Sequence, residues 1–223
     1  MVIHPAARPD AAVARALGDA VLTSGLAMRA AGNSRPAAAA EHTIAHFWEM
    51  AGVVGVEKYD YHGVLVAIAA ATVFPIYVAF FDEIRTRLPD PERDVVEPLD
   101  HLSLLDRLVA PYRAKMIAET GETPVLLKER RRRVARFVES AESIVERANT
   151  LLPELEAALG ALRSAGFPLT PASAGISDDA VTTALRYVPY LRDRFGVFDL
   201  ILYLGWEDRL GLPSPAGRAT GTS

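Results

Sequence analysis

Three histidines and two glutamates with metal-binding potential lie close together in the N-terminal third of the chain. His42 and His46 are four residues apart, and this spacing places both imidazole rings on one face of a helix. Glu41 and Glu49 flank them, and His62 follows after a short connecting segment. Because imidazole and carboxylate groups are ligands for divalent ions, the pattern indicates a metal-binding platform.

The spacing alone leaves a structural explanation open. From spacing alone, His42 and His62 could be partly buried histidines whose ring nitrogens are satisfied by backbone carbonyls. The aromatic neighbours Phe47 and Trp48 are expected to pack in the core.

Composition excludes several kinds of site. The chain has 223 residues, half of them hydrophobic and 23% charged, which is typical of a folded globular protein. It contains no cysteine, so a metal must be held by histidine, carboxylate or water. The net charge of -4 gives no basic excess for binding nucleic acid. The N-terminus lacks the apolar region of a signal peptide, and together these features predict a cytoplasmic protein.

The uncharged, apolar segment from Gly63 to Phe81 is long enough to cross a membrane. A buried core helix has the same composition. Pro75 interrupts the segment, and Arg or Lys anchors are missing from its immediate flanks. We therefore expect a core helix and no membrane contact.

The periodicity of apolar residues predicts an all-α protein, because no stretch alternates like a strand. Gly and Pro residues divide the pattern, and Ser177 should cap the last long helix. We expect one helical domain over residues 1–210. A Gly-, Pro-, Ser- and Thr-rich disordered tail is expected over 211–223. The main helices are predicted over residues 10–32, 37–50, 62–88, 102–119, 125–149 and 153–166.

Familiar nucleotide and nucleophile motifs are missing. The sequence has no Gly-x-Gly-x-x-Gly, no phosphate loop and no Gly-x-Ser-x-Gly turn. The basic run Lys128–Arg133 could suggest an anion or RNA patch. Acidic residues follow it at helical spacing, so a solvated, ion-paired helix face is the favoured interpretation.

Several short motifs then occur together, from about residue 10 to 205. They are Ser24-Gly25-Leu26-Ala27-Met28, Gly32-Asn33-Ser34-Arg35-Pro36, Glu41-His42, His46-Phe47-Trp48-Glu49, His62-Gly63, Gly175-Ile176-Ser177 and the segment Arg192–Leu200. This combination resembles the sn-glycerol-1-phosphate dehydrogenases of the iron-containing alcohol dehydrogenase and dehydroquinate synthase-like group. The resemblance is to the C-terminal half of those enzymes only.

The resemblance implies a fold and a site. The fold would be a helical bundle like the C-terminal domain of that group, with His42 and His62 as ligands of a divalent metal (zinc, nickel or iron). Arg35 would grip the phosphate of a polyol phosphate substrate, although a contact to a carbonyl or carboxylate at a helix end is an equal alternative. His46 would face the substrate or contact a metal ligand. The Ala37–Ala40 run departs from the Ser and Gly usual in relatives, which puts local substrate contacts in doubt.

The resemblance also implies missing parts. The family's third metal ligand, an Asp, and its glycine-rich pyrophosphate segment both lie upstream of the region matched. NAD(P) is therefore expected only if a partner subunit or a longer chain supplies the nucleotide-binding domain. We also expect a homo-oligomer or hetero-oligomer, since the face that this domain would cover is otherwise exposed. The alternative is a non-catalytic helical binding or oligomerisation module derived from the same domain.

Overall fold

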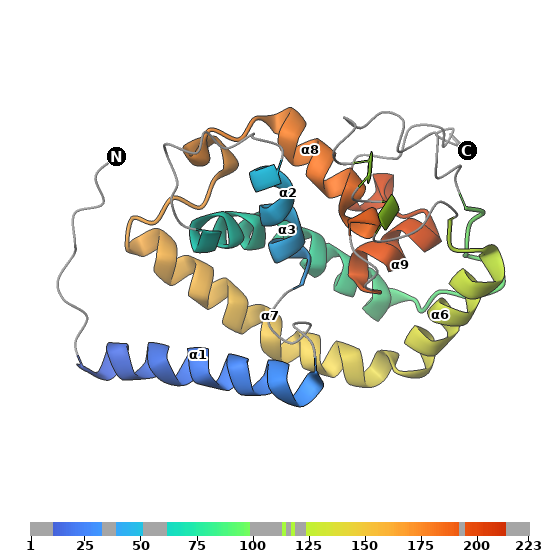
Figure 1. Ribbon diagram of the computed structural model, residues 1–223. Coiled ribbons are helices and arrows are strands. Elements are labelled where there is room, and N and C mark those ends of the chain that lie inside the picture. Colours follow the sequence, from blue (N-terminus) through green and yellow to red (C-terminus); the bar gives the residue numbers. More distant parts are fainter. Residues whose placement is uncertain are drawn as a thin grey trace. The chain divides into compact units, whose positions relative to one another are not determined.

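The computed structural model confirms an all-helical architecture, and none of the residues it describes lies in a strand (Figure 1). The chain divides into two compact units, Met1–Ala39 and Ala40–Ser223, which we describe separately. The structure describes residues 11–32, 39–50, 62–98, 113–114, 117–118, 124–191 and 195–212.

The described part of the first unit is one helix, α1 (Ala11–Ala31). It ends as predicted at Gly32, whose φ of 65° lies in the left-handed region that favours glycine. Three large apolar side chains on α1, those of Val21, Leu22 and Leu26, are exposed.

In the second unit, α2 (Ala40–Met50) packs against α3 (His62–Thr86). The buried face of α2 includes Ile44, Phe47 and Trp48, in agreement with the core position expected for the two aromatic residues. The Trp48 indole Nε1 donates a hydrogen bond to the Ala180 carbonyl at 3.3 Å, which ties α2 to another helix. The predicted start of α2 at residue 37 lies outside the described residues.

Helix α3 is the core helix that the sequence predicts. Among the described helices, it is the one long and apolar enough to span a membrane by length and composition. It contacts α2 and α7 as well as α9 (Figure 1). Pro75 lies inside it at an exposed position. Its buried residues are Val64, Leu65, Ile68, Ala69, Val73, Ile76, Phe80, Phe81 and Ile84.

The boundary between the next two helices differs from the prediction. Instead of breaking between residues 149 and 153, the chain breaks at Ser140, between α6 (Leu127–Glu139) and α7 (Ala141–Ser164). The Ser140 amide donates to the Phe137 carbonyl at 3.1 Å, a tighter turn than that of an α-helix. Pro153 lies inside α7 at an exposed position, and its missing N–H removes one backbone hydrogen bond from the helix.

Helix α7 ends where predicted. Gly166 has a φ of 76°, and the Phe167 amide donates to the Leu162 carbonyl at 2.9 Å. The Gly166 amide donates to the Arg163 carbonyl at 2.9 Å, which completes a Schellman motif.

The described residues after Gly166 form two α-helices and three short 3₁₀ turns. The Ser177 hydroxyl accepts a hydrogen bond from the Ala180 amide at 3.2 Å, which confirms the predicted cap of α8. The Asp199 carboxylate accepts one from the Gly196 amide at 2.9 Å at the start of α9, and every residue of α9 after Val197 is buried. The elements are η2 (Pro171–Ala174), α8 (Asp178–Tyr187), η3 (Val188–Tyr190), α9 (Val197–Leu204) and η4 (Asp208–Leu210).

The basic run is ion-paired, as predicted, but its partners in the described residues are Glu92 and Glu129 and not the acidic residues downstream, and one of its arginines is buried and not solvated. The Arg130 side chain is buried, with its guanidinium 4.8 Å from the centre of the Tyr203 ring. Arg132 and Arg133 both pair with Glu129, at 2.8 and 2.9 Å. These two hydrogen-bonded cations lower the pKa of the Glu129 carboxyl to about 2.

Two further predictions fall mainly outside the described residues. Of the helix predicted over 102–119, only residues 113–114 and 117–118 are described, and they are helical. Of the predicted tail over 211–223, only Gly211 and Leu212 are described, and Leu212 is buried. The extent of the predicted domain over 1–210 stays a prediction.

An apolar cavity of about 620 Å³ lies against α3 and α7. Tyr77 and Phe81 of α3 line it opposite Ile144 and Leu152 of α7, and Val197 of α9 contributes to the lining. Burial raises the pKa of the Tyr77 hydroxyl well above its ordinary value, so this group stays neutral.

Candidate metal site

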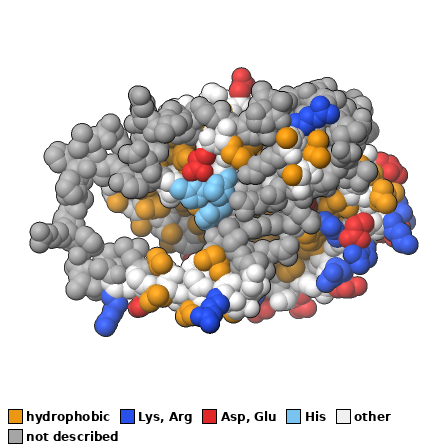
Figure 2. Space-filling model, viewed as in Figure 1, with side chains coloured by type: hydrophobic (Ala, Val, Ile, Leu, Met, Phe, Trp, Pro, Cys, Tyr) orange, Lys and Arg blue, Asp and Glu red, His pale blue; other side chains and the backbone are white. Residues whose placement is uncertain are grey.

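The candidate site lies where the second half of α2 faces the first turn of α3. Ile44 and Trp48 anchor one side of α2 in the core, and this fixes the rotation of the helix about its axis. His42, His46 and Glu49 lie outside that buried face, and His62 is the first residue of α3. The histidine side chains form one pale-blue surface patch in Figure 2.

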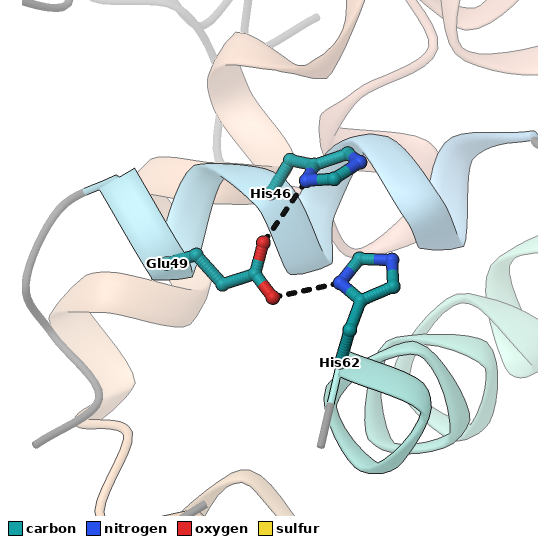
Figure 3. A group of neighbouring side chains, drawn as sticks. All are labelled: His46, Glu49 and His62. Carbon is teal, nitrogen blue, oxygen red and sulfur yellow. Dashed lines mark hydrogen bonds and ion pairs between the residues drawn. The ribbon is translucent and has the colours of Figure 1, made fainter. Parts of the chain in front are cut away.

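The Glu49 carboxylate connects the two helices. Its Oε1 accepts a hydrogen bond from His62 Nδ1 at 2.7 Å, and its Oε2 accepts one from His46 Nδ1 at 2.9 Å (Figure 3). The His46 and His62 rings are stacked, with their centres 4.5 Å apart and an interplanar angle of 25°. One carboxylate thus holds an imidazole from each helix.

His42 lies beside this group with a carboxylate partner of its own. Its Nδ1 donates to Glu41 Oε1 at 3.1 Å. The centre of its ring is 5.6 Å from that of His62, and the two rings are tilted by 55°. The two predicted metal ligands are therefore neighbours in space, although they come from different helices.

The residues His46, Glu49 and His62 form a group that could hold one metal ion. One ligand atom from each of the three lies within 4.8 Å of the other two. Two imidazoles and a carboxylate suit zinc, nickel or iron. The side chains are 41%, 35% and 38% exposed, respectively, so a bound ion would remain accessible to a further ligand.

The electrostatics keep Glu49 ionised. Partial burial raises the pKa of the Glu49 carboxyl. The hydrogen bonds from His62 and His46, together with the charges of these two histidines, lower the pKa by more than burial raises it. The net result is a pKa below the ordinary value of 4.5. Glu49 is therefore a carboxylate at neutral pH, as a metal ligand must be.

The sequence-predicted residues have different outcomes. His42, His46 and His62 come together at one place, and their roles stay predictions. Arg35 lies outside the described residues. Glu49 was included in the predicted metal-binding platform but was not assigned a role of its own, and it is part of the cluster.

The fold and this cluster define the chain as an all-helical protein with a candidate site for a divalent metal. Its similarity to known proteins is partial. Over 63 residues it is 40% identical to "Glycerol-1-phosphate dehydrogenase [NAD(P)+]" of Halalkalibacterium halodurans, a stretch that covers 28% of this chain and 16% of that protein. Over 117 residues it is 31% identical to the protein of the same name from Geobacillus stearothermophilus, which covers 48% of this chain and 29% of the relative.

The chain therefore spans less than a third of the length of either relative it matches. No protein-family profile matches it, and neither does any solved structure. The two matches support an origin related to glycerol-1-phosphate dehydrogenase.

Proposed function

We propose that this chain is the metal-binding half of a glycerol-1-phosphate dehydrogenase-like oxidoreductase. Such an enzyme would transfer hydride between NAD(P) and the secondary alcohol of a polyol phosphate. The observation that carries the proposal is the group of three imidazoles and a carboxylate where α2 meets α3. The partial similarity to two dehydrogenases supports the choice of reaction.

In this proposal His62 is the central metal ligand, because it lies beside both His42 and His46. The family resemblance selects His42 as its partner, and Arg35 as the residue that binds the substrate phosphate. A bound divalent ion supplies Lewis-acid polarisation of the substrate hydroxyl. The exposed position of the cluster leaves room for a polyol phosphate to approach.

The nicotinamide must be bound elsewhere, because the sequence contains no glycine-rich dinucleotide fingerprint. We propose that a nucleotide-binding domain, in a partner subunit or in a longer chain, covers the histidine patch. A site with exposed imidazoles on one half and nicotinamide on the other would be assembled at that interface. A cytoplasmic location fits this role and stays part of the proposal.

Metal binding by the isolated chain tests the proposal directly. Titration calorimetry with Zn²⁺ and Ni²⁺ should show one site per chain, and ligand linkage should raise the melting temperature. His62→Ala should abolish both effects. Glu142→Gln, which changes an exposed carboxylate on α7, should leave both unchanged. A wild-type chain that binds neither ion would refute the metal-binding role.

The apolar cavity favours the second candidate function. A space of about 620 Å³ with a mostly apolar lining, which also includes Arg147 and Glu154, suits the binding of an apolar ligand, as expected of a helical binding module. If the chain is a non-catalytic module, we expect elemental analysis to find no divalent metal in protein purified without chelator. We also expect no shift in melting temperature with zinc or nickel.

A further inference from the structure

We propose that one face of α7 is the interface of a symmetric dimer, in which the α7 helices of two copies of this chain pack antiparallel. Leu151 lies at the centre of this interface, between Arg147 and Glu154. The inference goes beyond the proposed function, because it uses none of the histidines and no bound metal. It assigns a second copy of the chain to the surface around the apolar cavity.

The face of α7 around Leu151 is apolar and open. The Leu151 side chain is 59% exposed, although it is one of the residues that line the cavity. Ile144, Ala148 and Leu155 line the cavity from the same helix, and their spacing is that of a single helix face. Covering this face with a protein partner is favourable, because it removes large apolar side chains from water.

Two opposite charges flank Leu151 on this face. Arg147 precedes it by four residues and Glu154 follows it by three, and both contribute to the cavity lining. Neither side chain has a hydrogen bond or an ion pair to any residue that the structure describes. Their own helix offers no opposite charge either. The positions three and four residues from each side chain hold only uncharged residues, which are Ser143, Ile144, Thr150, Leu151, Ala157 and Ala158.

A second copy supplies a partner for both charges at once. Arg147 and Glu154 are seven residues apart, which is about two turns or ~10.5 Å along the helix. In a twofold dimer, two residues that face each other do so twice, once on each side of the axis. If the axis crosses α7 near Leu151, antiparallel packing places Arg147 of each copy opposite Glu154 of the other. The two Leu151 side chains then meet beside the axis.

The charges favour a second copy as the occupant of this surface. A small apolar molecule offers no group to the guanidinium or to the carboxylate, whereas the twofold copy matches both. Complementary charges of this kind select which surfaces associate and in which register, even where each exposed ion pair adds little affinity. Burial of Leu151 and its apolar neighbours supplies most of the affinity, and the ion pairs set the antiparallel orientation.

Charge reversal tests this arrangement. Analytical ultracentrifugation of the wild-type chain should show a monomer–dimer equilibrium that depends on concentration. Arg147→Glu and Glu154→Arg should each raise the dimer dissociation constant by ~10-fold or more, because symmetry places two pairs of like charges in the interface. The double variant exchanges the charges and restores both pairs, so its dissociation constant should return to within ~3-fold of the wild type.

Two further variants test the centre and the specificity of the interface. Leu151→Asp should raise the dissociation constant by ~100-fold or more, because it buries carboxylates beside the axis. Glu156→Arg makes the same charge change as Glu154→Arg at an exposed position on the opposite side of α7, so it should stay within ~3-fold of the wild type. Circular dichroism and Zn²⁺ titration should match the wild type in every variant. Loss of the dimer is then distinguishable from misfolding and from failure of the metal site.

Several results would overturn the dimer. One is a wild type that stays monomeric at the highest concentration measured, and another is a dimer that Leu151→Asp and both charge reversals leave intact. A double variant that dissociates as readily as the single variants would overturn the antiparallel pairing. A monomeric wild type that binds the fluorescent fatty acid cis-parinaric acid, and loses it in Leu151→Asp, would assign the cavity to a small apolar ligand instead.

Discussion

The Glu49 side chain shows how one residue connects two elements. Its two oxygens each accept a hydrogen bond from an imidazole, one on its own helix and one on α3. These bonds hold the two rings stacked, with their centres 4.5 Å apart. The positions of the two imidazoles therefore depend on a single carboxylate.

Asp94, after the end of α3, should make stability depend on pH. Its carboxylate accepts hydrogen bonds from the Asp90 amide at 2.7 Å and from Arg87. Burial raises the pKa of the Asp94 carboxyl, but these two partners lower the pKa by a larger amount. The pKa therefore lies below the ordinary value of 3.8. A depressed carboxyl pKa stabilises the fold above that ordinary value, and the effect disappears as the pH falls through the folded-state pKa.

Asp94→Asn should therefore lower the free energy of unfolding by about 0.5–1 kcal/mol at neutral pH, and by progressively less below pH ~4. Urea titrations at several pH values measure this difference. Glu92→Gln, a change at an exposed neighbouring carboxylate, is the control. If Asp94→Asn lowered the free energy of unfolding by the same amount at every pH down to ~2, the charge of Asp94 would not contribute to stability.

At this scale, the sequence identified the histidines but not their arrangement. Helical spacing predicted that His42 and His46 share a face, nearness in the sequence added His62, and the family resemblance assigned His42 and His62 as ligands. The sequence could not show that Glu49 reaches His62, because this contact depends on how α2 packs on α3. It also depends on the direction in which the chain enters α3.

At the scale of the elements, α2 contributes side chains both to the hydrophobic core and to the candidate metal site. Trp48 is fully buried and bonds to the Ala180 carbonyl of α8, while the histidines lie on other faces of the same short helix. We expect Trp48→Phe to destabilise the fold by about 1–3 kcal/mol, through the lost hydrogen bond and the smaller ring. Thermal or urea unfolding measures this cost.

In the proposed function, metal affinity should fall in the same variant, because a shifted α2 moves His42 and His46 relative to His62. Met50→Ala, at the more exposed end of α2, is the control and should change stability by less than about 1 kcal/mol. If Trp48→Phe left both quantities at wild-type values, α2 would not be held by this contact.

Pro153 inside α7 should limit the stability of that helix. Proline cannot donate to the carbonyl four residues earlier, which here belongs to Asn149. Pro153→Ala should therefore raise the free energy of unfolding by about 1–3 kcal/mol and increase the helical signal in circular dichroism. Exposed Ala157→Gly in the same helix should instead lower it by about 1 kcal/mol. A destabilised Pro153→Ala would mean that packing requires a bend at this position.

Most helix positions followed from the sequence, because apolar periodicity and the capping residues Ser177 and Gly166 act locally. The break between α6 and α7 did not. Pro153 is the stronger local signal, yet the chain turns at Ser140, so tertiary packing overrides the proline. Local propensity cannot report such a balance between distant contacts.

At the scale of the whole molecule, the proposal predicts an activity that needs two parts. The purified chain alone should not reduce NAD⁺ with glycerol 1-phosphate, since it has no dinucleotide fingerprint. Addition of the nucleotide-binding part of the Halalkalibacterium halodurans relative, with zinc or nickel, should produce NADH, measured at its absorbance maximum. His62→Ala in this chain should abolish that signal. A mixture that forms a complex, binds metal and remains inactive would favour the non-catalytic alternative.

The double use of α2 has an evolutionary consequence. A substitution that resizes the hydrophobic side around Ile44 or Trp48 also reorients the imidazoles on the other faces. If the cluster binds an ion as proposed, selection for heat tolerance and selection for ion affinity act on the same helix of eleven residues. In relatives of this protein, those two traits should change together rather than separately.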